Sequence, residues 1–121
     1  MRGKVNLAEK LASFDETWTT KLVGELNGQV VKLAKTEGEF VWHTHAEEDE
    51  LFLVLEGALD IHLPDEVVVS LAPGELYIVP RGVPHKPVGN ASVLLFEPAT
   101  TRNTGEVDNE YTIEAADVER I

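Results

Sequence analysis

Two histidines separated by a single residue are the clearest sign of a functional site in this sequence. His43 and His45 lie in the stretch from Gly38 to Gly57. Residues two apart on an extended strand share a face, with their Cα atoms roughly 6.5 Å apart. Two imidazoles at that spacing can bind one cation. Glu50 follows an acidic turn, and it can return a carboxylate oxygen to the same level if the flanking strands form a hairpin.

A third histidine follows a loop built for a fixed conformation. His85 comes after Pro80, Gly82 and Pro84. Proline fixes φ and glycine permits positive φ, so this loop should direct the histidine one way. The fourth histidine, His62, lies outside both stretches and is interpreted as a surface or packing residue. The predicted metal ligands are His43, His45, Glu50 and His85.

With these residues in view, the chain resembles the small single-domain cupins. Residues 38–57 match the first motif of that family, and residues 74–90 match the second. The two motifs and the segment between them cover somewhat under half the chain. Two positions depart from the pattern: Gly38 is one residue closer to His43 than usual, and Gly89 stands where the family has an asparagine, one position before Asn90. The residues that carry the resemblance are His43, His45, Glu50, Gly57, Gly74, Pro80, Gly82 and His85.

The turn signals indicate an all-β fold. From Lys21 onward there are about eight short strand patterns with turn residues every 8 to 12 positions or so, as in antiparallel sandwiches and barrels. The resemblance sharpens this to an antiparallel jelly-roll β-barrel with a short N-terminal helix. We expect one domain over residues 1–121, with an arm (1–20), the barrel (21–98) and a tail (99–121) that, as in small cupins, covers the barrel or binds a partner.

Individual elements can be placed from their patterns. Asn6 to Phe14 is predicted as a helix capped by Asn6, and Asn27-Gly28 predicts a hairpin between strands at 21–26 and 29–35. A strand over residues 40–45 would place Phe40 and Trp42 on the face opposite His43. Further strands are expected at 51–55, 58–63, 67–71, 76–79 and 92–97, with a strand or helical turn at 114–121.

Composition limits the classes of partner. The 121 residues carry a net charge of −12, which argues against nucleic acid and anionic membranes as partners. There is no cysteine, so any metal must be bound by nitrogen and oxygen. The sequence shows no signal-peptide pattern, and a cytoplasmic location is expected. A homodimer is predicted through the segment around Trp18 or the tail.

Three nitrogens and one carboxylate suit one divalent ion of iron, manganese, nickel or zinc. The leading hypothesis is a His3Glu metal site that acts on a small polar molecule. Among the possible reactions, isomerisation or epimerisation of a sugar or sugar phosphate ranks first, because small cupins are similar to the barrel of some phosphomannose isomerases. The alternatives are an Fe(II)-dependent oxygenase and a non-catalytic module for small ligands. No catalytic residue and no organic cofactor are predicted, and Arg81 and Lys86 are the only basic residues inside the motifs.

Overall fold

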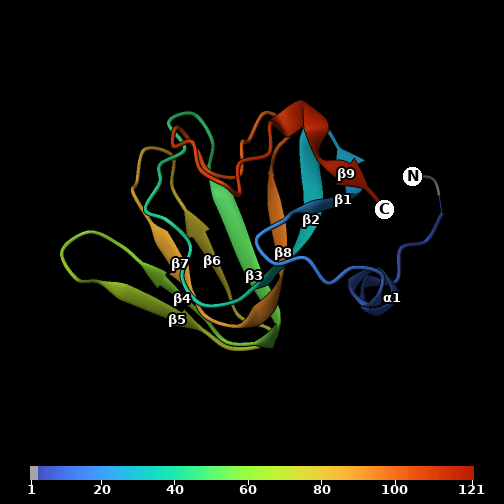
Figure 1. Cartoon of the computed structure of the whole chain (residues 1–121), viewed down its shortest axis with the longest axis horizontal. Helices are drawn as coiled ribbons and strands as arrows, with labels where there is room; N and C mark the ends of the chain where they lie inside the picture. The colour runs from blue at the N-terminus through green and yellow to red at the C-terminus, as the bar shows by residue number, and fades with distance from the viewer. Residues whose placement is uncertain (1–2) are drawn as a thin grey trace.

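Two β-sheets face each other in this computed structural model, which describes residues 3–121 (Figure 1). The larger sheet has the strand order β6-β3-β8-β2-β1-β9, and the smaller has the order β5-β4-β7. All pairs are antiparallel except β1 with β9. The predicted all-β jelly roll with a short N-terminal helix is confirmed. The elements are α1 (Leu7–Ala12), β1 (Lys21–Leu26), β2 (Gln29–Thr36), β3 (Glu50–Gly57), β4 (Leu59–His62), β5 (Val68–Leu71), β6 (Leu76–Val79), β7 (Lys86–Val88), β8 (Ala91–Pro98), η1 (Ala115–Asp117) and β9 (Glu119–Arg120).

The hairpin between β1 and β2 forms where the sequence predicts it. Asn27 and Gly28 both have positive φ, 48° and 77°, as a type I′ turn requires. Beyond β2 the chain leaves the sheet, and β8 pairs with β2 along its whole length. Since β8 also pairs with β3, the chain segments on either side of the histidine pair lie next to the same central strand.

The core has two parts. Between the sheets, Phe52 and Val54 of β3 pack with Leu59 and Ile61 of β4. The second part lies under α1 on the outer face of the larger sheet, where Leu11 and Phe14 pack with Val23 and Leu33. The helix begins as predicted, because the side chain of Asn6 accepts a hydrogen bond from the backbone N–H of Glu9 at 3.0 Å.

The predicted strand over residues 40–45 is wrong. This segment makes only isolated bridges, between Glu39 and Val88 and between His43 and His85. The two bridges differ in register by one residue, and the neighbouring Pro87 has no N–H to continue a ladder. The ring of Phe40 therefore packs edge-on against His43 at 5.4 Å, on the same side and not on the opposite face. Trp42 is not packed between the sheets but lies 46% exposed.

Both ends of the chain pack on this irregular segment. Trp18 of the N-terminal arm is buried, stacks on Phe40 at 4.7 Å and donates a hydrogen bond from Nε1 to the Glu37 carbonyl. The tail crosses the upper end of the barrel in the view of Figure 1, and its Tyr111 lies 5.9 Å from Phe40. Tail residues Thr101 and Thr104 are fully buried. The tail thus covers the barrel at the end that holds the histidines.

The chain ends in both of the forms expected for residues 114–121, the 3-10 turn η1 and the short strand β9. The short strand β7 was not predicted. Within residues 3–121 no helix is long and apolar enough to cross a membrane.

Candidate metal centre

Three separate segments bring the predicted ligands together. His43 and His45 lie on the irregular segment after β2, Glu50 is the first residue of β3, and His85 immediately precedes β7. The backbones of His43 and His85 pair directly, with the amide of each donating to the carbonyl of the other at 3.0 and 2.9 Å. Glu50 lies opposite Val79, the last residue before the Pro80 loop that leads to His85. The two sequence motifs are therefore joined by backbone hydrogen bonds around the site.

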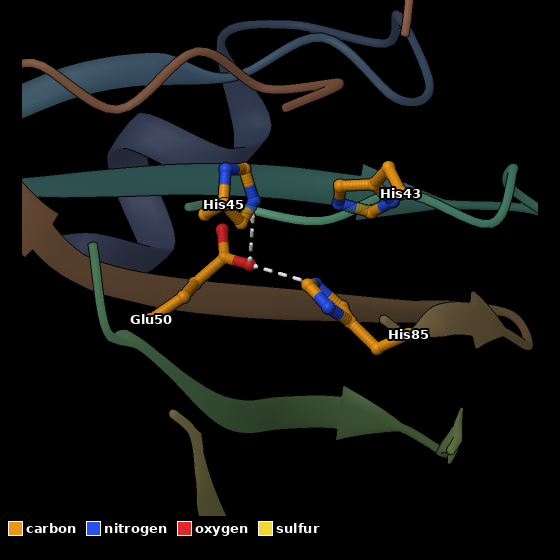
Figure 2. A group of neighbouring side chains, drawn as sticks. All are labelled: His43, His45, Glu50 and His85. Atoms are coloured by element: carbon orange, nitrogen blue, oxygen red, sulfur yellow. Dashed lines mark hydrogen bonds and ion pairs between the residues drawn. The ribbon is translucent and has the colours of Figure 1, made fainter. Parts of the chain in front are cut away.

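The four side chains form one buried cluster (Figure 2). Each offers a ligand atom, and these atoms all lie within 4.8 Å of one another. The exposed fractions are 5% for His43, 3% for His45, 4% for Glu50 and 0% for His85. One oxygen of Glu50 lies 3.4 Å from Nε2 of His45 and 3.3 Å from Nε2 of His85. The structure thus brings together all four residues that the sequence predicted as ligands.

Backbone carbonyls orient two of the rings in the same way. Nδ1 of His43 lies 2.8 Å from the Val41 carbonyl, and Nδ1 of His85 lies 3.0 Å from the Val83 carbonyl. A carbonyl only accepts, so Nδ1 carries the proton in both rings. In the neutral rings Nε2 then keeps its lone pair, which is the tautomer that a metal ligand requires.

The surroundings of the third ring, His45, indicate whether a metal ion fits the cluster. Both of its ring nitrogens are buried; Nδ1 has no polar partner among the described residues, and Nε2 has the Glu50 carboxylate at 3.4 Å without forming a regular hydrogen bond to it. Buried polar atoms without partners are rare, because they lose their water contacts without replacement. A cation at the centre of the cluster would provide a partner for one nitrogen of His45, whereas the other two rings already have carbonyl partners at Nδ1. The donor set, three imidazoles and a carboxylate, fits a divalent metal ion.

The charge states also suit metal binding. Burial, assisted by the neighbouring His85, lowers the pKa of His43 to about 4, so its ring is neutral at physiological pH. Burial alone would raise the pKa of the Glu50 carboxyl, but its interactions with His45 and His85 outweigh burial and hold that pKa well below its ordinary value. Neutral imidazole and ionised carboxylate are the ligating forms.

A second buried carboxylate, missed in the sequence, lies beside the cluster. Glu97 is on β8, and continuing the pairing of Leu51 with Phe96 by one residue places it opposite Glu50. Its Oε1 lies 3.0 Å from Nζ of Lys32, and the two side chains are only 1% and 3% exposed. Burial and the adjacent Glu50 raise the pKa of Glu97 well above its ordinary value, with Lys32 opposing them. The signal was present in the sequence, since both charges stand at inward positions of otherwise apolar strand patterns.

A cavity of about 40 Å³ adjoins the cluster. His43, Glu50 and Glu97 line one part of it, and apolar side chains such as Phe52 and Leu95 line much of the rest. No lysine or arginine of the described chain lines this cavity. A cavity needs at least about 10–15 Å³ for each water, so this one has room for roughly three waters or a ligand of a few heavy atoms.

The remaining polar residues of the motifs lie outside the cavity. Arg81 is exposed and pairs with Asp49 at 3.3 Å, and Lys86 pairs with Glu39 at 3.1 Å, so neither cation is directed at the metal ligands. Oδ1 of Asn90 accepts a hydrogen bond from the amide of Gly38 at 2.9 Å. This contact joins the start of the first motif to the end of the second, which is a structural role. His62 lies on β4, apart from the cluster.

Comparison with known proteins agrees with the fold. The family model of the cupin domain (Cupin_2) matches residues 29–96, more than half of the chain. The chain belongs to the cupin family. A crystal structure of a cupin-2 domain containing protein from Shewanella frigidimarina is 41% identical with a TM-score of 0.76, over 78% of this cupin and 93% of that chain. Protein NMB1881 from Neisseria meningitidis is 28% identical with a TM-score of 0.73, over 79% of this chain and 99% of that one.

One curated relative is also similar. It is the uncharacterized protein YdbB of Bacillus subtilis, 39% identical over 64 residues. The match covers 53% of this cupin and 57% of the relative's length. The names of these three proteins indicate no substrate.

Proposed function

We propose that this cupin binds one divalent metal ion through His43, His45, Glu50 and His85 and acts on a small polar molecule in the adjoining cavity. The observation that carries the proposal is the cluster itself, in which the buried His45 ring forms no regular hydrogen bond although its Nε2 lies 3.4 Å from the Glu50 carboxylate. The neutral state of His43 and the ionised state of Glu50 support it. Iron, manganese, nickel and zinc all remain compatible with three nitrogens and one oxygen.

The chemistry proposed is isomerisation or epimerisation of a hydroxycarbonyl compound. When bound, a divalent ion polarises a carbonyl oxygen and so acidifies the neighbouring C–H. The chain contributes the cavity, whose apolar walls exclude bulk water, and the carboxyl group of Glu97 beside Glu50. Lys32 is the cationic partner of Glu97, at 3.0 Å.

The cavity narrows the substrates within this proposal. It has room for few atoms, and no lysine or arginine of the described residues lines it. Arg81 and Lys86, the cations considered for a phosphate, are paired with Asp49 and Glu39 outside it. A small neutral hydroxyaldehyde or hydroxyketone therefore suits the site better than a sugar phosphate does.

Proton exchange in heavy water tests this function. The metal-loaded protein is incubated with glyceraldehyde or dihydroxyacetone in D2O and followed by NMR. We expect deuterium at the carbon next to the carbonyl and interconversion of the two sugars, both lost in His85→Ala and kept in His62→Ala. Exchange no faster than in protein-free buffer would contradict isomerisation. Substrate-dependent oxygen uptake by the iron-loaded protein would instead favour the oxygenase, and binding without turnover would favour the non-catalytic module.

We also keep the homodimer and the cytoplasmic location as proposals. Trp18 packs on Phe40 of its own chain, so the contact with a second copy should lie elsewhere. The edge strand β6 supports an alternative, because its Leu76 and Ile78 are 53% and 50% exposed and an unpaired strand edge can pair with another copy. Sedimentation should give twice the 13.3 kDa chain mass, and a monomer at micromolar concentration would contradict the dimer.

A further inference from the structure

Glu97 is a buried carboxyl group that lines the cavity. Its side chain is 1% exposed, and Oε1 is held by Nζ of Lys32 at 3.0 Å. Oε2 is buried and receives no hydrogen bond from an N–H or O–H of another described residue; the carboxyl group beside Glu97 is that of Glu50, and both line the same cavity as His43. A buried carboxyl oxygen without a partner is costly, since the water contacts it has lost are not replaced. A bound molecule that donates a hydrogen bond would supply the missing partner.

The cavity limits which donor this can be. No cationic side chain of residues 3–121 lines it, while two carboxyl groups do. An anionic group near Glu97 would meet the negative charge of Glu50, because continued pairing of β3 with β8 places these two residues opposite each other. A hydroxyl group is neutral, small and able both to donate and to accept, so it fits a carboxyl oxygen in a space of about 40 Å³.

The position next to Glu50 gives this contact a role. We propose that Glu97 is a substrate-contacting residue that hydrogen-bonds a hydroxyl group of a small neutral ligand beside the metal ligands, and that Lys32 is a positioning residue that fixes its other oxygen. The inference rests on the proposed function for the metal, but the Glu97 contact is separable from it by experiment. The Glu97 contact makes the cavity selective for neutral hydroxylated compounds.

Three ketones of similar size form the probe set. Hydroxyacetone carries a hydroxyl group, butanone has a methyl group in its place, and pyruvate has a carboxylate in place of the whole hydroxymethyl group. Their dissociation constants are measured by NMR titration of the full-length chain, both metal-free and loaded with zinc. We expect hydroxyacetone to bind at least about tenfold more tightly than either butanone or pyruvate, as for a hydrogen bond to a carboxyl group.

Two variants test the role of Glu97, and a third controls for the loss of a buried, paired charge. Glu97→Gln keeps the shape, and the double variant Lys32→Met with Glu97→Leu replaces the pair with apolar groups in case the single change fails to fold. Lys21→Met is the matched control: Lys21 is also 3% exposed and paired, with Glu16 and Glu119, but it does not line the cavity. The preference for hydroxyacetone over butanone should fall to about twofold or less in the folded Glu97 variants and survive in the control, with zinc stoichiometry unchanged in all.

The outcomes separate this inference from the proposed function. If zinc binds and deuterium exchange occurs but the Glu97 variants keep the preference, the contact is wrong and the function stands. If no zinc binds but the preference is present and depends on Glu97, the contact stands and the metal proposal fails. Equal binding of hydroxyacetone and butanone by the unmodified chain would mean that water alone satisfies Oε2, and would overturn the inference.

Discussion

His43 and His85 exchange two backbone hydrogen bonds, at 3.0 and 2.9 Å, and their rings lie 4.3 Å apart. The two residues are 42 positions apart in the sequence and belong to different motifs. The ring positions are thus set by the backbone and by the carbonyls of Val41 and Val83, which hold each Nδ1. The barrel core of Val54, Ile61 and their neighbours is a separate apolar cluster.

Removing a ligand ring should therefore remove the metal and leave the fold. In His43→Ala and His85→Ala the paired backbone groups remain, so we expect stoichiometric metal to be lost while the far-UV circular dichroism is unchanged. The lost packing should cost about 1–3 kcal/mol of unfolding free energy. His62→Ala, which changes a histidine outside the cluster, should keep the metal. An unfolded His43→Ala or His85→Ala protein would show that the rings hold the barrel together.

The metal-free protein should become less stable as pH falls from 6.5 to about 4. Burial lowers the pKa of His43 from 6.5 to about 4, so in this interval the unfolded chain takes up a proton that the folded chain refuses. The stabilising contribution is complete above pH 6.5 and lost by about pH 4, amounting to about 3 kcal/mol. Urea unfolding across this range, compared with His43→Gln, measures it. Parallel curves for the two proteins would contradict the assignment to His43.

Two glycines with the same backbone conformation should differ sharply when changed to alanine. Gly57 and Gly82 both have φ of 79°. A Cβ at Gly57 would lie 2.2 Å from the Asn90 carbonyl oxygen, whereas a Cβ at Gly82 meets nothing within 4 Å. Gly82→Ala should cost about 1 kcal/mol from the left-handed conformation alone, and Gly57→Ala clearly more. Chemical unfolding of both variants checks this, and equal losses would show that β3 and β8 yield easily at that contact.

The buried pair of Lys32 and Glu97 should behave non-additively. Lys32→Met leaves Glu97 buried beside Glu50 without its cation, and should cost about 3–5 kcal/mol. Replacing both residues, Lys32→Met with Glu97→Leu, should restore the unfolding free energy to within about 1 kcal/mol of the unchanged protein. A double-mutant cycle by urea unfolding measures the coupling. A double variant as unstable as the sum of its single changes would contradict the direct pairing.

The fold and the ligands were predictable because their signals are local. Asn27-Gly28 requires positive φ at both positions, and Phe52 and Val54 alternate with half-buried residues along β3. The four ligands fall at motif spacings that sequence alone displays. Each of these signals depends on neighbours within a few residues, so no knowledge of tertiary contacts was needed.

The sequence-based predictions failed for residues whose conformation or role is set by tertiary contacts. Residues 40–45 have the alternation of a strand, but their backbone pairing with residues 85–88 is limited to an isolated bridge at His85 and one hydrogen bond to Pro87, so no ladder forms and Phe40 packs on His43. Glu97 was read as the end of a strand, because its importance comes from Lys32 and Glu50 on neighbouring strands that only the sheet order brings together.

The metal content of the purified protein tests the central claim most directly. The protein is isolated without chelators or an affinity metal column and analysed by elemental mass spectrometry, beside His85→Ala and His62→Ala. Four converging ligand atoms and a buried His45 ring that forms no regular hydrogen bond predict about one iron, manganese, nickel or zinc ion per chain, absent only from His85→Ala. A chain that carries no metal, and takes up none when these ions are added, would contradict the account.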